Sequence, residues 1–238
     1  MSKVATLVLF TFLNVLLSCG KEDTVPDVIP VVKEKLVVVL GSSTAYGTGA
    51  NPIDSSWVNK LSQKFAADKK KISIINLAAG GYSTYEVLPQ GLNPSNRPAA
   101  DTARNIEKAI KLSPDYVIIN LPSNDINNGY SDKETLDNYQ LLASRLNLQK
   151  IPFLITSTQP RNLATMDARK RLQDFNPQLT ALLPNNVINY YSLLTDPATL
   201  NIASAVSAGD GIHLNNSGHT IIYNAFLNDK RMMPALGY

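Results

Sequence analysis

Five short runs of mostly β-branched and aromatic residues do most to limit what this 238-residue chain can fold into. The first run, residues 36–40, is apolar at every position and stops at Gly41. A continuous apolar run of this length is typical of a strand that is covered on both faces, as in a parallel sheet. Each run is followed by a loop with Gly, Ser, Asn or Pro, and the predicted strands are residues 36–40, 72–77, 116–121, 153–156 and 187–191.

Segments with a helical pattern separate these strands. Asp101 and Ser131 stand where N-caps are expected, and Glu134 follows Ser131 by three residues, which completes a capping-box pattern. Strands that alternate with helices predict the α/β class, as a three-layer α/β/α sandwich with a mostly parallel five-stranded sheet. In such folds the ligand site lies beyond the carboxyl ends of the strands. The predicted helices are residues 56–67, 101–112, 132–146, 167–183 with a break near Pro177, and about 217–227.

The composition excludes several kinds of functional site. With 22 Lys and Arg residues against 19 Asp and Glu, the net charge of +3 is too small to indicate a nucleic-acid-binding surface. A single cysteine forms no internal disulfide, and two histidines are too few for a His-rich metal site. We therefore expect no nucleic-acid partner, no metal and no cofactor.

The N-terminal residues have the layout of an export signal. Lys3 precedes a largely apolar run, residues 4–17, and the small residues Ser18-Cys19-Gly20 follow it. The run is too short for a membrane-spanning helix, which needs about 20 apolar residues. Residues 16–19 resemble the bacterial lipoprotein box, in which the cysteine is lipidated and becomes the mature N-terminus. The alternative is an ordinary secretory signal that ends near a cysteine.

This pattern divides the chain into three parts. We expect a lipoprotein-type signal peptide over residues 1–18, a tether over residues 19–34 that begins at lipidated Cys19, and one domain over residues 35–238. The expected location follows from the lipid. The protein would be exported and anchored to a membrane of the bacterial cell envelope, on its periplasmic or outer-membrane face.

Distinctive polar residues gather in the loops after the first three predicted strands and in one loop near the C-terminus. The four blocks are Gly41-Ser42-Ser43-Thr44-Ala45, Ala79-Gly80-Gly81-Tyr82, Pro122-Ser123-Asn124-Asp125 and residues 210–219, which begin Asp210-Gly211-Ile212-His213. In this order they resemble the signature blocks of the SGNH (GDSL-type) esterase and lipase superfamily. The resemblance extends from residue 36 to about residue 227, and it implies a flavodoxin-like hydrolase fold and the hydrolysis of carboxylic esters.

These residues also supply the groups that acyl transfer requires: a nucleophile, a base oriented by a third group, and donors to a developing oxyanion. Ser43, just after the first strand, is the predicted nucleophile, and His213 is the predicted general base. Asp210, three residues before His213, is expected to accept a hydrogen bond from the other ring nitrogen and so fix its tautomer. The predicted oxyanion hole consists of the backbone N–H groups of Ser43 and Gly81 and the side-chain amide of Asn124.

The sequence departs from the family pattern at two positions, with Ser42 where the family has Asp and Pro122 where it has Gly. We expect Ser42 to cap neighbouring backbone N–H groups and Pro122 to stiffen its turn. Ser42 and Ser83 are alternative nucleophiles, but the spacing from the preceding glycine favours Ser43 over Ser42, and Ser83 lacks the closing glycine of a Gly-x-Ser-x-Gly elbow. His219 is expected to have a structural role, because no carboxylate stands three residues before it.

The loops around the predicted site are polar and rich in amide side chains, whereas a lipase site usually has an apolar border. Oriented hydrogen bonds and aromatic faces suit a hydroxylated substrate. We therefore expect an esterase that removes acetyl or another short acyl group from a carbohydrate, with Arg97, Arg161 and Tyr82 as candidate substrate-binding residues. The alternatives are an enzyme of the lipase or lysophospholipase type and a non-catalytic, glycan-binding surface lipoprotein.

Overall fold

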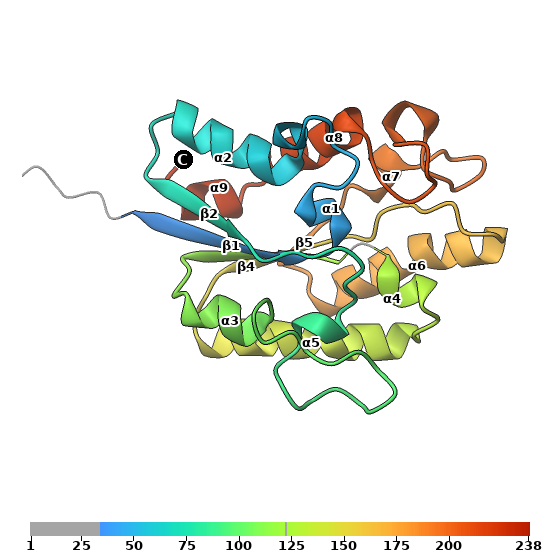
Figure 1. Cartoon of the computed structure of the whole chain (residues 1–238), viewed down its shortest axis with the longest axis horizontal. Helices are drawn as coiled ribbons and strands as arrows, with labels where there is room; N and C mark the ends of the chain where they lie inside the picture. Colours follow the sequence, from blue (N-terminus) through green and yellow to red (C-terminus); the bar gives the residue numbers. More distant parts are fainter. Residues whose placement is uncertain (1–33, 122) are drawn as a thin grey trace, which may run out of the picture. The chain divides into compact units, whose positions relative to one another are not determined.

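The computed structural model describes residues 34–121 and 123–238, which contain a five-stranded sheet (Figure 1). Across the sheet the strands follow the order β2-β1-β3-β4-β5, and every neighbouring pair is parallel. The predicted α/β class and the five-stranded parallel sheet are therefore confirmed. The strands are β1 (Lys35–Gly41), β2 (Ile72–Asn76), β3 (Tyr116–Asn120), β4 (Phe153–Thr156) and β5 (Val187–Ile188).

Two sequence predictions lie outside the described residues: the N-terminal signal and tether with Cys19, and the role of Pro122. The residues that the structure does describe belong to one compact unit. Among the helices of this unit, none combines the length and the apolar character that crossing a membrane requires.

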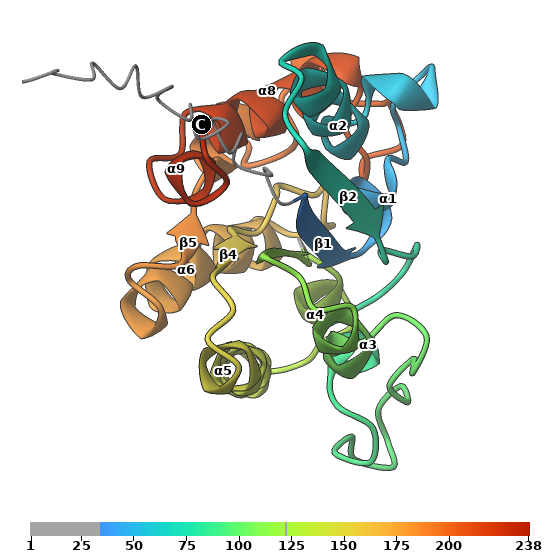
Figure 2. The same ribbon diagram turned by 90° about the vertical axis from the view of Figure 1, so that its left-hand side faces the viewer.

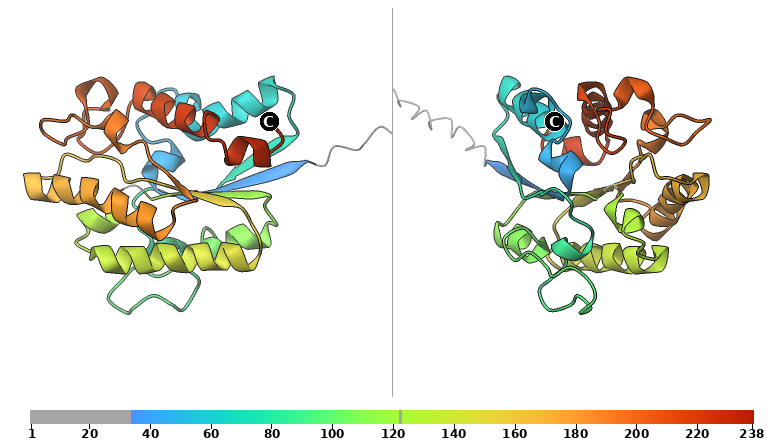
Figure 3. Two further views of the ribbon diagram at one scale, coloured as in Figure 1. Left: turned by 180° about the vertical axis from the view of Figure 1, so that it is seen from behind. Right: turned by 45° about the vertical axis from the view of Figure 1, so that its right-hand side comes forward.

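The helices are α1 (Ser43–Tyr46), α2 (Trp57–Ala67), α3 (Ile106–Lys111), α4 (Asn124–Asn127), α5 (Asp132–Leu148), α6 (Met166–Leu182), α7 (Tyr191–Leu194), α8 (Asn216–Leu227) and α9 (Met232–Ala235). Of these, α2, α8 and α9 cover one face of the sheet, and α3, α5 and α6 cover the other (Figure 2, Figure 3). Successive side chains of a strand point to opposite faces, so the apolar run within β1, residues 36–40, contributes to two cores. Val38 and Leu40 pack in the core under α3 and α5, while Val37 and Val39 pack in the core under α2 and α8.

One predicted helix begins later than expected. α3 starts at Ile106 rather than at residue 101, because Asn105 and not Asp101 is its N-cap. The Oδ1 atom of Asn105 accepts a hydrogen bond from the Lys108 N–H at 3.0 Å. Asp101 instead accepts a hydrogen bond from the Tyr82 hydroxyl. Its other oxygen accepts the Ala103 N–H at 2.9 Å, a local contact that lies before the start of α3 and therefore does not cap the helix.

The break that we predicted near Pro177 does not occur, since α6 continues to Leu182. Pro177 lies on the exposed face of α6, where water is able to hydrogen-bond the carbonyl group that loses its helical partner. β5 is shorter than predicted, because α7 begins at Tyr191. The predicted capping box at Ser131 is present at the start of α5.

The strand order places three of the four polar blocks at one point of the sheet. β1 lies between β2 and β3, so the order of the strands reverses at β1, and ligands of such sheets bind at this switch. Ser43 follows β1, Gly81 follows β2, and Asn124 follows β3. Because the register pairs Gly41 with Asn120, the carboxyl ends of β1 and β3 lie side by side.

Candidate active site

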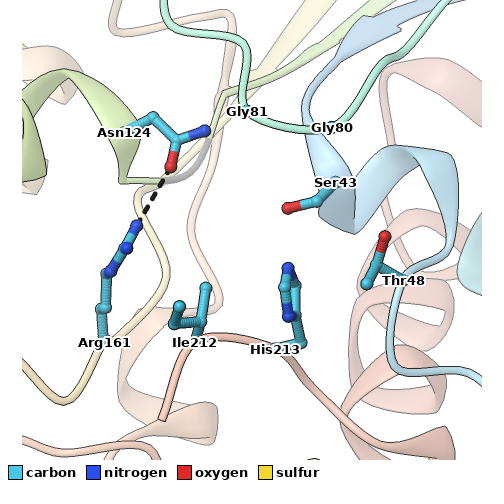
Figure 4. Close-up of a pocket in the computed structure, with 8 residues that line it drawn as sticks. All are labelled: Ser43, Thr48, Gly80, Gly81, Asn124, Arg161, Ile212 and His213. Carbon is cyan, nitrogen blue, oxygen red and sulfur yellow. Dashed lines mark hydrogen bonds between the residues drawn. The ribbon is translucent and has the colours of Figure 1, made fainter. Parts of the chain in front are cut away.

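Ser43 is the first residue of α1, in the sharp turn that follows β1. Gly41 permits this turn, because a Cβ atom there would lie 2.6 Å from both the Ala45 Cβ atom and the Asn120 carbonyl oxygen. Ser42 is fully buried, whereas Ser43 is partly exposed and lines a pocket (Figure 4). Of the two neighbouring serines, Ser43 is therefore the one that a substrate is able to reach.

The pocket has a volume of about 370 Å³, which is at the small end of the range for ligand sites. Its walls come from the loops after β1, β2, β3 and β4 and from the loop before α8. Ile212 is the one large apolar side chain among the lining residues, and the others are glycines or residues with polar or charged side chains. The lining residues are Ser43, Thr48, Gly80, Gly81, Asn124, Arg161, Ile212 and His213.

His213 and Asp210 are held together within the loop that precedes α8. The Oδ2 atom of Asp210 lies 2.6 Å from Nδ1 of His213, and Oδ1 accepts the backbone N–H groups of Ile212 and His213 at 2.9 and 2.7 Å. Burial by itself raises the pKa of Asp210, but these hydrogen bonds outweigh burial and lower the pKa to about 2. Asp210 is therefore ionised at neutral pH, and the Nδ1–H group of His213 donates to it.

The other ring nitrogen of His213, Nε2, faces the Ser43 hydroxyl in the pocket (Figure 4). Between these two groups, as the described residues are arranged, there is no hydrogen bond. Such bonds are often long in an enzyme without substrate and shorten in the complex. The side chain of His213 is 19% exposed and that of Asp210 is 48% exposed, so the pair stands at the pocket mouth rather than in the core.

His219 has a different environment. It is fully buried in α8, where Nε2 lies 3.1 Å from the Thr48 carbonyl oxygen and Nδ1 accepts from the Trp57 N–H at 3.4 Å. Burial lowers the pKa of His219, which favours the neutral ring. Both nitrogens are thus used to join α8 to the segment that leads into α2, in agreement with the structural role predicted for His219.

The predicted oxyanion donors lie around Ser43. The backbone N–H groups of Ser43 and Gly81 make no hydrogen bond with another residue of the described chain. Gly81 has a φ of 85°, in the left-handed region that favours glycine. The Nδ2 atom of Asn124 is 2.8 Å from both Ser42 Oγ and the Tyr82 carbonyl oxygen.

The prediction that Ser42 caps neighbouring backbone N–H groups was wrong, because its hydroxyl accepts from Asn124 and caps no backbone N–H.

Of the three candidate substrate-binding residues, only Arg161 lines the pocket. Arg97 lies elsewhere, in an ion pair with Glu134 and with its guanidinium carbon 4.5 Å from the centre of the Tyr130 ring. Tyr82 turns its hydroxyl away to Asp101, and burial is the main reason that its pKa rises to about 12. The structure therefore corrects the placement of Arg97 and Tyr82, since the side chains of both are engaged outside the pocket.

Gln159 is a residue of the site that the sequence did not single out. Its buried side chain accepts from Thr44 Oγ1 at 2.8 Å and donates to the Ile212 carbonyl oxygen at 2.9 Å. It thus bridges the Ser43 turn and the His213 loop. The one signal in the sequence is its place just after a predicted strand, and many polar loop residues share that signal.

No three His, Cys, Asp or Glu side chains of the described segments are grouped so that they would hold a metal ion.

Together, the α/β/α sandwich and a pocket that holds a serine, a histidine and its bound aspartate define the class of this protein as an acyl hydrolase. More particularly, the chain belongs to the GDSL-like Lipase/Acylhydrolase family, whose model matches residues 39–221. As a member of this family it is an esterase or acylhydrolase.

Solved structures with the same fold include three that are informative by name. A putative acylhydrolase from Bacteroides fragilis is 22% identical with a TM-score of 0.60, over 81% of this chain and 85% of that one. A GDSL-like lipase from Bacteroides thetaiotaomicron is 22% identical with a TM-score of 0.61, over 83% and 88%. An acetyl xylan esterase is 14% identical with a TM-score of 0.61, over 81% and 98%. No curated protein sequence matches the chain.

Proposed function

We propose that this chain is a serine esterase with a triad of Ser43, His213 and Asp210. The observation that carries the proposal is the arrangement in Figure 4, where the one accessible serine of the turn after β1 faces the histidine that Asp210 holds at 2.6 Å. A nucleophile, a base and a group that orients the base are the parts that serine hydrolases share on unrelated folds.

The proposed reaction proceeds through an acyl-enzyme. Ser43 Oγ attacks the ester carbonyl carbon while its proton passes to Nε2 of His213, and the carbonyl oxygen becomes an oxyanion. The C–O bond to the alcohol then breaks, and His213 returns the proton to the departing oxygen. Water, deprotonated by the same nitrogen, attacks the acyl carbon. The bond from this carbon to Ser43 Oγ then breaks, His213 returns the proton to Oγ, and the acid leaves. Asp210 remains ionised throughout, because hydrogen bonds hold its pKa near 2.

The proposed oxyanion site lies between the N–H groups of Ser43 and Gly81 and the amide of Asn124. The two backbone donors are free of other described partners. Nδ2 of Asn124 already donates to Ser42 and to the Tyr82 carbonyl, so it would share one of these hydrogens with the oxyanion. Preorganised donors of this kind typically contribute a factor of about 10²–10³ each to the rate.

The finer proposal is that the ester is a short acyl group, acetyl or similar, on a carbohydrate. The pocket volume of about 370 Å³ supports a short acyl group, because it leaves little room for a long acyl chain. The hydroxyl of Thr48 and the polar groups of Asn124 and Arg161 suit a hydroxylated alcohol. A structural neighbour carries the name acetyl xylan esterase, which agrees with this choice.

The test is hydrolysis of p-nitrophenyl esters graded from acetate to decanoate by the purified protein and by Ser43→Ala. We expect the highest kcat/KM on the shortest esters, because the pocket of about 370 Å³ leaves little room for longer chains. Ser43→Ala is expected to lose at least about a thousandfold in kcat, since it lacks the attacking oxygen, with an unchanged melting temperature because Ser43 is partly exposed.

The matched control is Ser42→Ala, one position earlier and fully buried, which removes an acceptor of Asn124 and leaves the attacking oxygen in place. It is expected to keep measurable activity. Equal turnover by the wild type and Ser43→Ala would contradict the triad, and absence of turnover by the wild type on every ester would favour the glycan-binding alternative. Rates that climb steadily to decanoate would instead favour the lipase alternative.

A further inference from the structure

Arg161 is a cation in the same pocket as Ser43 and His213 (Figure 4). It follows β4 and is partly buried, and its Nη1 atom donates to Oδ1 of Asn124 at 3.1 Å. A guanidinium group has five N–H donors. The described chain provides an acceptor for just this one contact of Arg161. Several N–H groups of a charged side chain therefore remain available in the pocket.

The other partly buried arginines differ from Arg161. Within residues 34–121 and 123–238, no carboxylate lies within ion-pair distance of Arg161. Burial of a charge without a partner is unfavourable, so a partly buried cation in a pocket indicates that a ligand supplies the counter-charge. Of the other partly buried arginines, Arg169 donates to two backbone carbonyl oxygens, those of Thr199 and Leu163. The remaining four pair with a carboxylate: Arg97 with Glu134, Arg104 with Asp101, Arg171 with Asp132 and Arg231 with Asp229.

The negative charge of Asp210 favours the protonated form of Arg161, but Asp210 does not take the place of a bound anion. Its two oxygen atoms already accept three hydrogen bonds, from the Ile212 N–H, the His213 N–H and the His213 ring. Asp210 is therefore hydrogen-bonded within its own loop, and among the described residues the guanidinium of Arg161 has no carboxylate bonded to it.

We propose that Arg161 binds a carboxylate of the substrate, and that the substrate is a short acyl ester of an acidic sugar such as a uronic acid. The inference rests on the proposed function. A short acyl group such as acetyl contains no ionisable group, so the carboxylate that Arg161 would bind belongs to the sugar. The N–H groups of a guanidinium form a planar fork that matches the two oxygens of a carboxylate.

Arg161 also orients the amide of Asn124, and this second role has a different signature. Loss of the hydrogen bond to Asn124 would slow the hydrolysis of every ester, charged or neutral, by the same factor. Loss of a carboxylate site would slow only the acidic ester. The ratio of the two specificity constants therefore isolates the proposed binding role.

The experiment measures kcat/KM for two sugars that differ only in charge: the methyl glycoside of 3-O-acetyl galacturonate and that of 3-O-acetyl galactose. We expect the wild type to prefer the acidic sugar by at least about tenfold, as for other charge-assisted hydrogen bonds. Arg161→Gln should bring this preference to about one, and Arg161→Lys should retain part of it. Arg145→Gln, on the exposed face of α5, removes the same charge at a residue that does not line the pocket and should keep the full preference.

A wild-type measurement keeps the inference testable if the Arg161 variants do not fold. Free galacturonate should inhibit p-nitrophenyl acetate hydrolysis at least about tenfold more strongly than free galactose. A wild-type preference near one, or a preference that survives in Arg161→Gln, would overturn the carboxylate site while hydrolysis that depends on Ser43 upholds the esterase. Absence of hydrolysis of all these esters would overturn the proposed function itself, and the inference with it.

Discussion

Asp125 joins two loops of the candidate site through one buried carboxylate. It is next to Asn124 in sequence, and its oxygens accept from the Thr84 N–H at 3.0 Å and from Thr84 Oγ1 at 2.5 Å. Thr84 in turn accepts from Asn138 of α5 at 2.8 Å. The loop that carries Gly81 is thereby tied to the turn that carries Asn124. Burial outweighs these hydrogen bonds and raises the pKa of Asp125 to about 6.

Asp125→Asn is expected to change how stability depends on pH. The pKa of Asp125 is raised from 3.8 to about 6, so the folded state holds the proton more tightly than the unfolded state between these values. Stability contributed by this group is therefore present below pH 4 and lost as pH rises to about 6. Urea unfolding from pH 4 to 7 should show the wild type losing about 3 kcal/mol relative to Asp125→Asn, at about 1.4 kcal/mol per pKa unit. Asp137→Asn, an exposed change on α5, is the control, and parallel pH profiles for wild type and Asp125→Asn would contradict the expectation.

At the scale of elements, the candidate site consists of three segments that contact one another but belong to no common helix or strand. Gln159, after β4, bonds Thr44 of α1 and the Ile212 carbonyl of the loop before α8. Close approach of the backbone adds to this contact, because a Cβ atom on Gly49 would lie 2.1 Å from the Leu214 carbonyl oxygen. The distance between Ser43 and His213 is thus set by packing between loops.

Gln159→Leu is expected to lower kcat with little change in KM. The leucine side chain has a similar volume but leaves Thr44 Oγ1 and the Ile212 carbonyl without this partner, so the Ser43 turn and the His213 loop lose their bridge. A misplacement of reacting groups by about 1 Å costs up to about 100-fold, and we expect a loss of about tenfold or more on p-nitrophenyl acetate. Gln140→Leu on the exposed face of α5 is the matched control. A rise in KM at constant kcat would show instead that Gln159 acts on substrate binding.

For the whole molecule, parallel pairing explains how distant blocks meet. All five strands run in one direction, so the loops after β1, β2, β3 and β4 open at the same edge of the sheet. The two cores on opposite faces keep this edge rigid at β1, β3 and β4, whose residues are mostly buried, whereas β2 at the side of the sheet is partly exposed. We further propose that the chain reaches the cell envelope as a lipoprotein, because the sequence before residue 20 resembles an export signal that ends in a lipoprotein box.

Cys19→Ser tests the proposed anchor in cells that express the whole chain. Serine lacks the thiol that carries the lipid, so the protein should move from the membrane fraction to the soluble fraction without loss of esterase activity. Ser18→Ala keeps a small residue beside the cysteine and should leave the protein in the membrane fraction. Immunoblots of the two fractions provide the measurement, and membrane retention of Cys19→Ser would refute a lipid anchor at this residue.

Local signals account for the parts of the fold that were predictable. The apolar run of β1 and the capping box at Ser131 depend on neighbouring residues, and both are present as predicted. The start of α3 was not predictable, because Asp101 and Asn105 are both residue types that favour N-caps, and Asn105 makes the capping contact while Asp101 bonds Tyr82 and Ala103. Arg97 was misplaced for a similar reason, since its partner Glu134 lies 37 positions away. Contacts of this range leave no pattern in a single sequence.

By itself the sequence determined the α/β class, the strand positions and the identity of Ser43, His213 and Asp210 as candidates, because periodicity, caps and short spacings are local properties of the chain. Only the tertiary structure decided which polar side chains share a pocket. It brought Arg161 to Asn124 and inserted Gln159 between two loops, while it bound Arg97 to Glu134 elsewhere. The reason is physical: partner choice for a long polar side chain depends on the three-dimensional distances that the folded sheet and its loops create.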